Sequence, residues 1–449
     1  MNHSVEAANV ISPPRNRPVP TAFSSILILV AMLWSCSPEP ASPVAGIDRL
    51  EFNRLAVRAN LPLFWTADED GDGAADPTEI VSLEFYPTRE VWVQDGAFTE
   101  RYRDQLEVLG RMAGQGLPEG LAPEESARME AVYRELDHGI PTLVYNDLRK
   151  MPEDHRKFLG HMMEVARLID ALYARHTGAE GLADRLPEDP ASSSLFRRNW
   201  GPECVAPRTQ DDPACTAIPG GASLVSDLYP AALQADAGFC ARLEARPDAA
   251  ELLDPFTVVR EQDGELTAVP YTEAYAEEMG AIAAELRSAA EALADPEEDP
   301  LRAYLAAAAR SFIDNDWKPA DEAWSRMNAR NSRWYVRVGP DEVYWEPCSQ
   351  KAGLHLTLAL LNTDSLAWED RILPVRQAME DDLAELIGPP YAARQVSFHL
   401  PDFIDIVVNA GDDRDPLGAT IGQSLPNWGP VANEGRGRTV AMSNLYTCL

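Results

Sequence analysis

Arg333-Trp334-Tyr335-Val336-Arg337-Val338 is the stretch at which the character of the chain changes. It is rich in β-branched and aromatic residues, which predicts a strand. The next such run, Leu354-His355-Leu356-Thr357-Leu358-Ala359-Leu360-Leu361, is longer and largely apolar. One helical segment and three shorter β-rich runs follow, at 369–386, 395–398, 404–408 and 438–445. We therefore predict a small β-rich core over residues 331–449.

The chain before this stretch has a different periodicity. Apolar residues recur at helical spacing, and Ala-, Glu- and Leu-rich segments are separated by breakers such as the Asp- and Pro-rich run 295–300. A mainly helical region over 47–330 that joins a β-rich core makes the predicted fold class α+β. We expect its helices at 48–60, 105–114, 123–136, 155–176, 271–294 and 301–314.

Length and charge limit what such a fold can do. The chain has 449 residues, with 39 Lys and Arg against 72 Asp and Glu, and so a formal net charge of −33. A field of this sign repels phosphate backbones and anionic headgroups, which argues against nucleic-acid binding and against membrane binding through a basic patch. Calcium sites and cationic partners are compatible with it. Nothing in the sequence specifies an oligomeric state.

The first 46 residues are typical of an export signal and a tether. Residues 1–35 combine two arginines with an apolar run that is too short to span a bilayer. Leu33-Trp34-Ser35-Cys36 resembles the lipobox of bacterial lipoproteins, and the Pro- and Ser-rich segment 36–46 has the composition of a flexible tether. We expect an exported protein of the bacterial cell envelope, held at the membrane only by a lipid on Cys36. Plain secretion and an uncleaved anchor are the alternatives.

Five cysteines follow the lipidation cysteine, and in an exported protein they favour disulfides. Cys204 and Cys215 lie in one Pro- and Asp-rich loop and would close a short bridge. Cys240 and Cys348 are then available for a long-range bridge, which leaves Cys448 over. No C-x-x-C spacing occurs, so a zinc ribbon or a thioredoxin-type site is not expected.

The sharpest local motif is Asp68-Glu69-Asp70-Gly71-Asp72-Gly73-Ala74-Ala75-Asp76-Pro77-Thr78-Glu79, which matches the twelve-residue EF-hand calcium loop. Gly73 takes the sharp turn at position six, a helix-compatible stretch precedes the loop, and Pro77 suits an early residue of an exiting helix. Ala75 at position eight replaces the branched apolar residue through which two hands usually pair, so we expect a solitary calcium site. The alternative is an acidic turn without metal. The expected ligands are the side chains of Asp68, Asp70, Asp72, Asp76 and Glu79 and the carbonyl of Ala74.

No other pattern points to a catalytic mechanism. The chain has no G-x-S-x-G, P-loop or H-E-x-x-H motif. His161 and Glu164 have the i, i+3 spacing of a helical metal half-site, but no second copy accompanies them. We interpret His155, His161 and His176 as solvated or core-edge histidines, and His355 as structural.

From about Arg333 onward, the chain resembles the β-core of the dipeptidyl-peptidase III family of zinc exopeptidases. Four stretches carry this resemblance, in the order in which the family has them. They are Glu342-Val343-Tyr344; Pro401-Asp402-Phe403 with the later turn Ala410-Gly411; Leu425-Pro426-Asn427-Trp428; and Glu434-Gly435 with Thr439-Val440-Ala441-Met442-Ser443-Asn444.

The resemblance implies that peptides dock by adding a strand to a sheet edge. The edge would be Gly422-Gln423-Ser424-Leu425 with Asn427, and Tyr344 would be a neighbouring side chain that contacts the peptide. An exposed edge offers unpaired N–H and C=O groups at strand spacing, which is what such docking requires. The alternative is that these residues only form a strand and its turn.

The chain departs from the family in its zinc motif. The resemblance implies a catalytic zinc on a helix with H-E-x-x-G-H and a further Glu on a second helix, both after the β-core, and neither occurs in this sequence. We therefore expect a calcium-binding lipoprotein that is a truncated, inactive front part of such a peptidase, with no zinc site of its own. A non-catalytic peptide-binding or scaffolding lipoprotein is the second reading. An active hydrolase with another mechanism is the third.

Overall fold

The computed structural model of the protein describes residues 44, 46–83, 90–396, 400–415 and 421–446. The expected signal peptide, the lipidation residue Cys36, most of the tether and Cys448 lie outside these residues. No helix in the described part of the chain has both the length and the apolar character needed to cross a membrane.

The chain divides into two compact units. The first comprises residues 1–126 and 139–141, and the second comprises 127–138 and 142–449. The change in secondary structure near residue 330 is thus not a boundary between compact units. The strands after it pack against helices that precede it, so the helical and β-rich parts share one core.

The first unit has a small aromatic core, formed by two helices and two short strand pairs. Asp48 and Thr99 cap the helices through side chains that accept backbone N–H bonds. Phe52, Trp65 and Tyr102 are almost completely buried in the core. The elements are α1 Arg49–Arg58, β1 Leu63–Trp65, β2 Ile80–Ser82, β3 Val93–Gln94, β4 Ala97–Phe98 and α2 Glu100–Gln115.

The helices of the second unit are mostly short, with three long ones. Helix α4 (Glu153–Thr177) buries Phe158, Met162, Val165 and Ile169, which recur every three or four residues. The other helices are α3 Pro123–Leu136, which begins in the first unit, α5 Pro190–Asn199, α6 Ala231–Gln234, α7 Phe239–Glu244, α8 Ala249–Leu252, α9 Tyr271–Ala274, α10 Ala276–Ala292, α11 Asp299–Asp314, α12 Lys318–Trp324, α13 Leu366–Ile372, α14 Arg376–Ile387, α15 Gly429–Asn433 and α16 Ser443–Tyr446, with 3-10 turns at Glu180–Arg185, Pro296–Glu298 and Thr363–Ser365.

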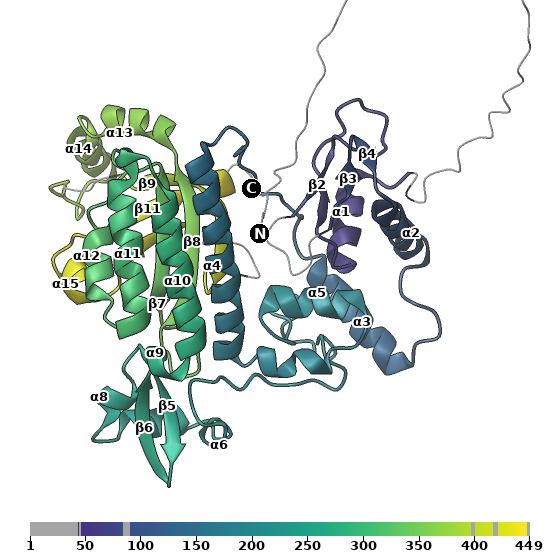
Figure 1. Ribbon diagram of the computed structural model, residues 1–449, viewed down its shortest axis with the longest axis horizontal. Coiled ribbons are helices and arrows are strands. Elements are labelled where there is room, and N and C mark those ends of the chain that lie inside the picture. The colour runs from purple at the N-terminus through teal and green to yellow at the C-terminus, as the bar shows by residue number, and fades with distance from the viewer. Residues whose placement is uncertain (1–43, 45, 84–89, 397–399, 416–420, 447–449) are drawn as a thin grey trace, which may run out of the picture. The chain divides into compact units, whose positions relative to one another are not determined.

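A five-stranded mixed sheet forms the centre of the second unit. Its order is β10-β11-β9-β8-β7, with β11 and β9 parallel and the other neighbours antiparallel. Helix α4 packs against β8 and β9, α11 packs against β7, and α10 lies between these two helices (Figure 1). The strands are β7 Trp334–Glu342, β8 Gly353–Leu361, β9 Asp402–Gly411, β10 Gly422–Leu425 and β11 Arg438–Met442.

A separate hairpin, β5 Thr257–Gln262 with β6 Glu265–Pro270, projects from the end of the helical layer (Figure 1). Asp263 and Gly264 join its strands with φ angles of 54° and 84°, the left-handed values that a tight hairpin turn requires.

The α+β prediction is confirmed, and most of the long helices lie within a few residues of their predicted bounds. The predicted helix 369–386 is wrong as a single element. It is two helices, α13 and α14, because Pro374 lies between them and cannot continue a helix. The hairpin β5–β6 was missed altogether.

Candidate functional site

Strand β10 forms one edge of the five-stranded sheet, and within the described chain no strand pairs with its outer side. Its inner side pairs with β11, in a register that sets Gly422 opposite Ala441 and Ser424 opposite Thr439. The N–H of Met442 donates to the carbonyl of Ile421 at 3.0 Å. Because bonding alternates along an antiparallel ladder, Gln423 and Leu425 bond to β11 as well. The backbone groups of Gly422 and Ser424 therefore point away from the sheet.

The structure places Asn427, which follows this edge, against the end of β7, two residues before Tyr344. The side-chain amide of Asn427 donates to the carbonyl of Asp341 at 3.0 Å and to the carboxylate of Glu342 at 3.1 Å. Tyr344 follows two residues later and is 71% exposed. The edge residues and the Glu342-Val343-Tyr344 stretch, which are about eighty positions apart in sequence, thus meet in one place.

Beneath this edge, the sheet buries a network of charged side chains. Asp341 is the extra residue of a β-bulge in β7, since Pro340 pairs with Leu354 and Glu342 with Gly353. A bulge re-aims a side chain, and here the carboxylate of Asp341 faces the interior. The guanidinium of Arg337 contacts it with two nitrogens, one of them at 2.6 Å, and also reaches the carboxylate of Asp321 at 2.7 Å.

His355 on β8 lies at the centre of this network and is 0% exposed. Its Nε2 is 2.7 Å from the carboxylate of Asp341, and its Nδ1 is 3.1 Å from the carboxylate of Asp413, which follows β9. Asp413 in turn accepts hydrogen bonds from the hydroxyl of Thr357 and, at 2.7 Å, from the side-chain amide of Gln423 on β10.

The partners of His355 decide its charge. Burial alone would lower the pKa of the imidazole, but the carboxylates of Asp413 and Asp341 outweigh burial and raise it to about 10. The pKa values of Asp341 and Asp413 are lowered despite their burial, because Arg337 and His355 stabilise the charged carboxylates. All three groups are ionised at neutral pH.

Two further carboxyl groups, those of Asp412 and Glu342, lie near this network and form no ion pair with a Lys or Arg of the described chain. Burial, with a contribution from the charge of Asp413, raises the pKa of Asp412 to about 7, although His355 and a hydrogen bond from Tyr173 at 3.0 Å oppose the shift. Burial and the charge of Asp341 also raise the pKa of Glu342. The surroundings of Tyr344 are therefore acidic.

Sequence reasoning missed most of this network. His355 was interpreted as structural only, and neither Asp341 nor Asp413 was singled out. The available signal was the placement of Asp341 and of the Asp412-Asp413 pair at the ends of β-rich runs, but the register that joins them to His355 was not visible in the sequence.

In the first unit, the acidic loop 68–79 joins β1 to β2, which pair as a hairpin. The expected helix that would begin near Pro77 is therefore wrong: Glu79 is followed directly by β2, because pairing with β1 buries Ile80 against Trp65 and its neighbours. The segment that enters the loop is β1, and helix α1 ends earlier, at Arg58.

Within the loop, the structure gathers oxygen atoms around one point. Ligand atoms of Asp68, Asp70 and Glu79 lie within 4.8 Å of one another. Asp68 accepts backbone N–H bonds from Gly71 at 2.9 Å and Gly73 at 3.2 Å, and both glycines have φ near +75°. Asp72 accepts a bond from the N–H of Ala74 at 2.7 Å.

Glu79 is the buried residue of the loop, with an exposed fraction of 2%. Its carboxylate accepts bonds from the Trp65 indole at 3.0 Å and from the N–H of Glu69 and of Asp76 at 2.5 and 3.1 Å. Burial and the charges of Asp70, Asp72 and Glu79 raise the pKa of Asp76, so the loop concentrates negative charge. This donor set of hard oxygens fits calcium. The carboxylates of Asp72 and Asp76 are outside this cluster of three.

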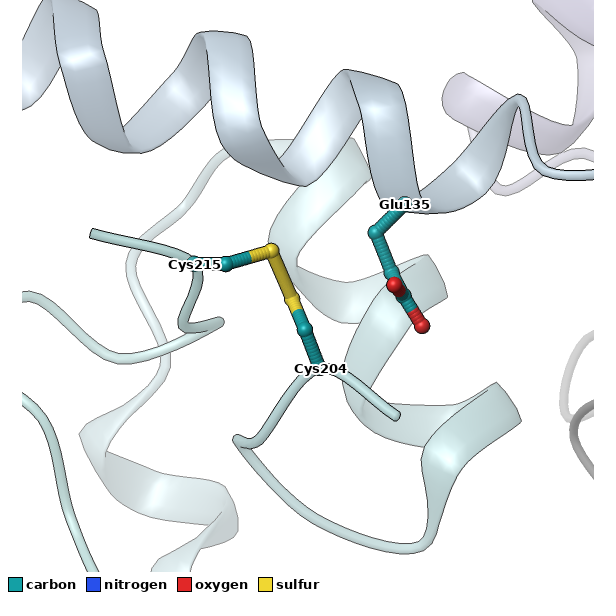
Figure 2. Close-up of side chains that lie close together, drawn as sticks. All are labelled: Glu135, Cys204 and Cys215. Carbon is teal, nitrogen blue, oxygen red and sulfur yellow. A yellow bond between two sulfur atoms is a disulfide. The ribbon is translucent and has the colours of Figure 1, made fainter. Parts of the chain in front are cut away.

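A second group of potential metal ligands, Glu135 with Cys204 and Cys215, does not fit a metal (Figure 2). The two sulfurs are joined in a disulfide, so neither is a thiolate. The carboxylate of Glu135 instead accepts bonds from Arg198, Asn199 and Thr209. These two groups are the only ones found among the described residues. A second disulfide joins Cys240 to Cys348.

No protein-family model and no curated protein matches the chain. Solved structures do match it. The structure of DPP III from Caldithrix abyssi has a TM-score of 0.57 and 26% identity, and the match covers 68% of this chain. The fold is dipeptidyl-peptidase III-like. The structure of dipeptidyl-peptidase III from Corallococcus sp. strain EGB has a TM-score of 0.55 and 23% identity over 72% of this chain.

The dipeptidyl-peptidase III-like fold agrees with the resemblance of the C-terminal third and extends well beyond that third. The matches cover 58% and 59% of the two solved chains, so this chain corresponds to less than two thirds of their length.

Proposed function

We propose that this chain binds extended peptides at the outer edge of β10, as the peptide-docking core of a dipeptidyl-peptidase III-like metallopeptidase. The observation that carries the proposal is the outward direction of the backbone groups of Gly422 and Ser424 on a strand that has no outer neighbour within the described chain. A peptide that adds a strand there gains main-chain hydrogen bonds without requiring any particular side chain.

The acidic surroundings of this edge favour a peptide with a free amino terminus. The carboxylate of Glu342 is held by Asn427, and Asp412 and Tyr344 are close to it. An ammonium group beside Glu342 would be attracted by these carboxylates and would keep the Glu342 carboxylate ionised. Recognition of a free amine would also suit a protein whose structural neighbours are called dipeptidyl-peptidases. An enzyme that releases dipeptides must hold the free amino terminus at a fixed distance from the bond it cleaves.

Calorimetry with tetra-alanine tests this proposal. Ser424→Pro removes the outward N–H at the centre of the edge and leaves the bonds to β11 intact, so binding should weaken about tenfold or more. Ser424→Ala keeps the N–H and should bind like the unsubstituted protein. N-acetylated tetra-alanine should bind more weakly to all three. Equal affinities for the proline and alanine variants, with both folded, would place docking elsewhere.

Among the residues that the structure describes, no group of side chains fits the zinc chemistry implied by the family resemblance. Among the described residues, the two groups of potential metal ligands are the acidic loop and a disulfide beside Glu135. We therefore derive no hydrolytic step for this chain. Peptide docking is the part of the function that its own residues support, and it is common to a peptidase and to a non-catalytic peptide-binding lipoprotein.

We also propose that the loop 68–79 binds one calcium ion. Asp68, Asp70 and Glu79 supply carboxylate oxygens around one point, and none of them forms an ion pair with a Lys or Arg of the described chain. Calcium would supply the missing positive charge and fix the turn between β1 and β2. The dissociation constant of such a single exported site would fall in the range of about 10⁻⁴ to 10⁻³ M.

Export and lipid attachment at Cys36 complete the proposal. They rest on the Leu33-Trp34-Ser35-Cys36 motif and on the tether composition that follows it. Cys36→Ala should release the protein from the membrane fraction and leave its precursor unprocessed. Mass analysis that finds an unmodified amino terminus at another residue would favour plain secretion.

A further inference from the structure

The docking strand β10 is held by side chains at both of its ends. At one end, Gln423 turns into the sheet interior and donates to Asp413 at 2.7 Å. At the other end, Asn427 donates to the carbonyl of Asp341 at 3.0 Å. The strand has only four residues and one neighbouring strand within the described chain, so these two attachments add to the limited pairing that holds it.

Both attachments lead to the same buried ring. The carboxylate of Asp413 lies 3.1 Å from Nδ1 of His355, and the carboxylate of Asp341 lies 2.7 Å from its Nε2. The ring is completely buried, so water cannot replace it as a partner of either carboxylate. Among the described residues, His355 is therefore the side chain that contacts both Asp413, which accepts from Gln423, and Asp341, which accepts from Asn427.

We propose that His355 is a positioning residue for peptide docking: its imidazolium bridges Asp413 and Asp341, and through them it fixes the orientation of β10. This inference rests on the proposed function of β10. It assigns no contact between His355 and the peptide. The ring acts by keeping two aspartates in place: the carboxylate of Asp413 accepts from Gln423, and the backbone carbonyl of Asp341 accepts from Asn427.

The two aspartates depend on His355 to different degrees. Asp341 keeps the guanidinium of Arg337 if the ring is lost. Asp413 keeps only neutral partners in its immediate contacts, the hydroxyl of Thr357 and the amide of Gln423. An ionised carboxylate without a cation is costly in a buried site, so Asp413 would protonate or move. The end of β10 at Gln423 should loosen first.

Two measurements on His355→Gln test this inference. Tetra-alanine affinity should fall about tenfold, a coupling of the size expected between residues of one buried network. Hydrogen exchange at the amides of Gln423 and Leu425, which bond to β11, should speed up in the absence of peptide. The exchange measurement needs no peptide, so it distinguishes failure of the positioning role from failure of docking itself.

His155→Gln is the matched control. His155 is 1% exposed and its Nδ1 accepts a bond at 2.8 Å from the indole of Trp334, so it also supports the sheet, but it contacts no residue of β10. This variant should lose stability while keeping peptide affinity and the exchange rates of β10. Folded His355→Gln with unchanged affinity and unchanged exchange would overturn the inference.

If His355→Gln does not fold, Asp413→Asn tests the same claim. The asparagine retains the shape of the side chain and an oxygen that accepts from Gln423, but it removes the charge that pairs with His355. The same loosening of Gln423 and the same loss of affinity are expected. A folded Asp413→Asn variant with normal exchange and normal affinity would also overturn the proposal.

Discussion

Two acidic regions of this protein differ in whether cationic side chains pair with their clustered carboxylates. In the loop 68–79, Asp68, Asp70 and Glu79 converge without a cationic side chain, and most of the loop is exposed. In the five-stranded sheet, Asp341 and Asp413 are buried and share the cation His355, and Asp341 also pairs with Arg337. The comparison shows that the surroundings of a carboxylate, rather than its presence, decide whether the protein itself supplies the counter-charge.

This difference has a structural origin. The loop residues are neighbours in sequence, and their side chains are occupied by backbone N–H groups of the same loop. Such bonds orient carboxylate oxygens but do not neutralise them. The sheet residues come from β7, β8 and the end of β9, and strand pairing places cation and anion together with water excluded. The first arrangement is suited to a removable ion, and the second to a fixed framework.

The largest effect should come from removing the internal cation of the sheet. His355→Leu leaves Asp413 and Asp341 without their shared partner and should cost about 3–5 kcal/mol of unfolding free energy at pH 7. His161→Leu, at a partly exposed histidine paired with Glu285, should cost less than about 1 kcal/mol. Urea denaturation measures both. Equal costs would mean that the buried network contributes no more than a surface pair.

The same comparison predicts a pH dependence. Because the pKa of His355 is raised to about 10, its contribution to stability is fully present below its unfolded value of about 6.5 and is lost as pH rises through 10. The stability difference between the unsubstituted protein and His355→Leu should therefore shrink between pH 7 and pH 10. A constant difference over this range would show that His355 is neutral in the folded protein.

Adding an external cation to the loop should give the next largest effect. Calcium at a hundredfold excess over its dissociation constant should stabilise the first unit by about 2.7 kcal/mol, and a chelator should reverse the effect. Thermal melts of Glu79→Gln should not respond to calcium, because the buried carboxylate of the loop is lost. Glu69→Gln, at an exposed non-ligand position of the same loop, should respond normally. Identical melts with calcium and chelator would refute the site.

A smaller effect is expected at Asp412, a carboxyl group of the sheet region that lacks a cation of its own. Burial raises its pKa to about 7, so the folded state favours the protonated form and loses stability as pH rises from about 4 to 7. Asp412→Asn removes this penalty and should gain stability at pH 8, with little change at pH 4. A loss of stability at pH 8 would mean that the charged form is favoured.

Features carried by consecutive residues could be predicted from the sequence, and features that depend on strand register could not. The acidic loop was visible because twelve consecutive residues carry it, although the strand β2 that follows it was not. Pairing of Ile80 with Trp65 outweighs the helix-start preference of Pro77. The edge Gly422–Leu425 was located through a family resemblance. The network around His355 was not predictable, because a bulge at Asp341 sets its geometry and its partners are 14 and 58 positions away.

Residue-resolved hydrogen exchange with and without tetra-alanine tests the central claim, that β10 is a peptide-docking edge. Peptide should slow exchange at the amides of Gly422 and Ser424, which point away from the sheet, and should leave Gln423 and Leu425 unchanged because β11 already protects them. This alternation is specific to an added strand. Bound peptide that leaves Gly422 and Ser424 unprotected would contradict the account.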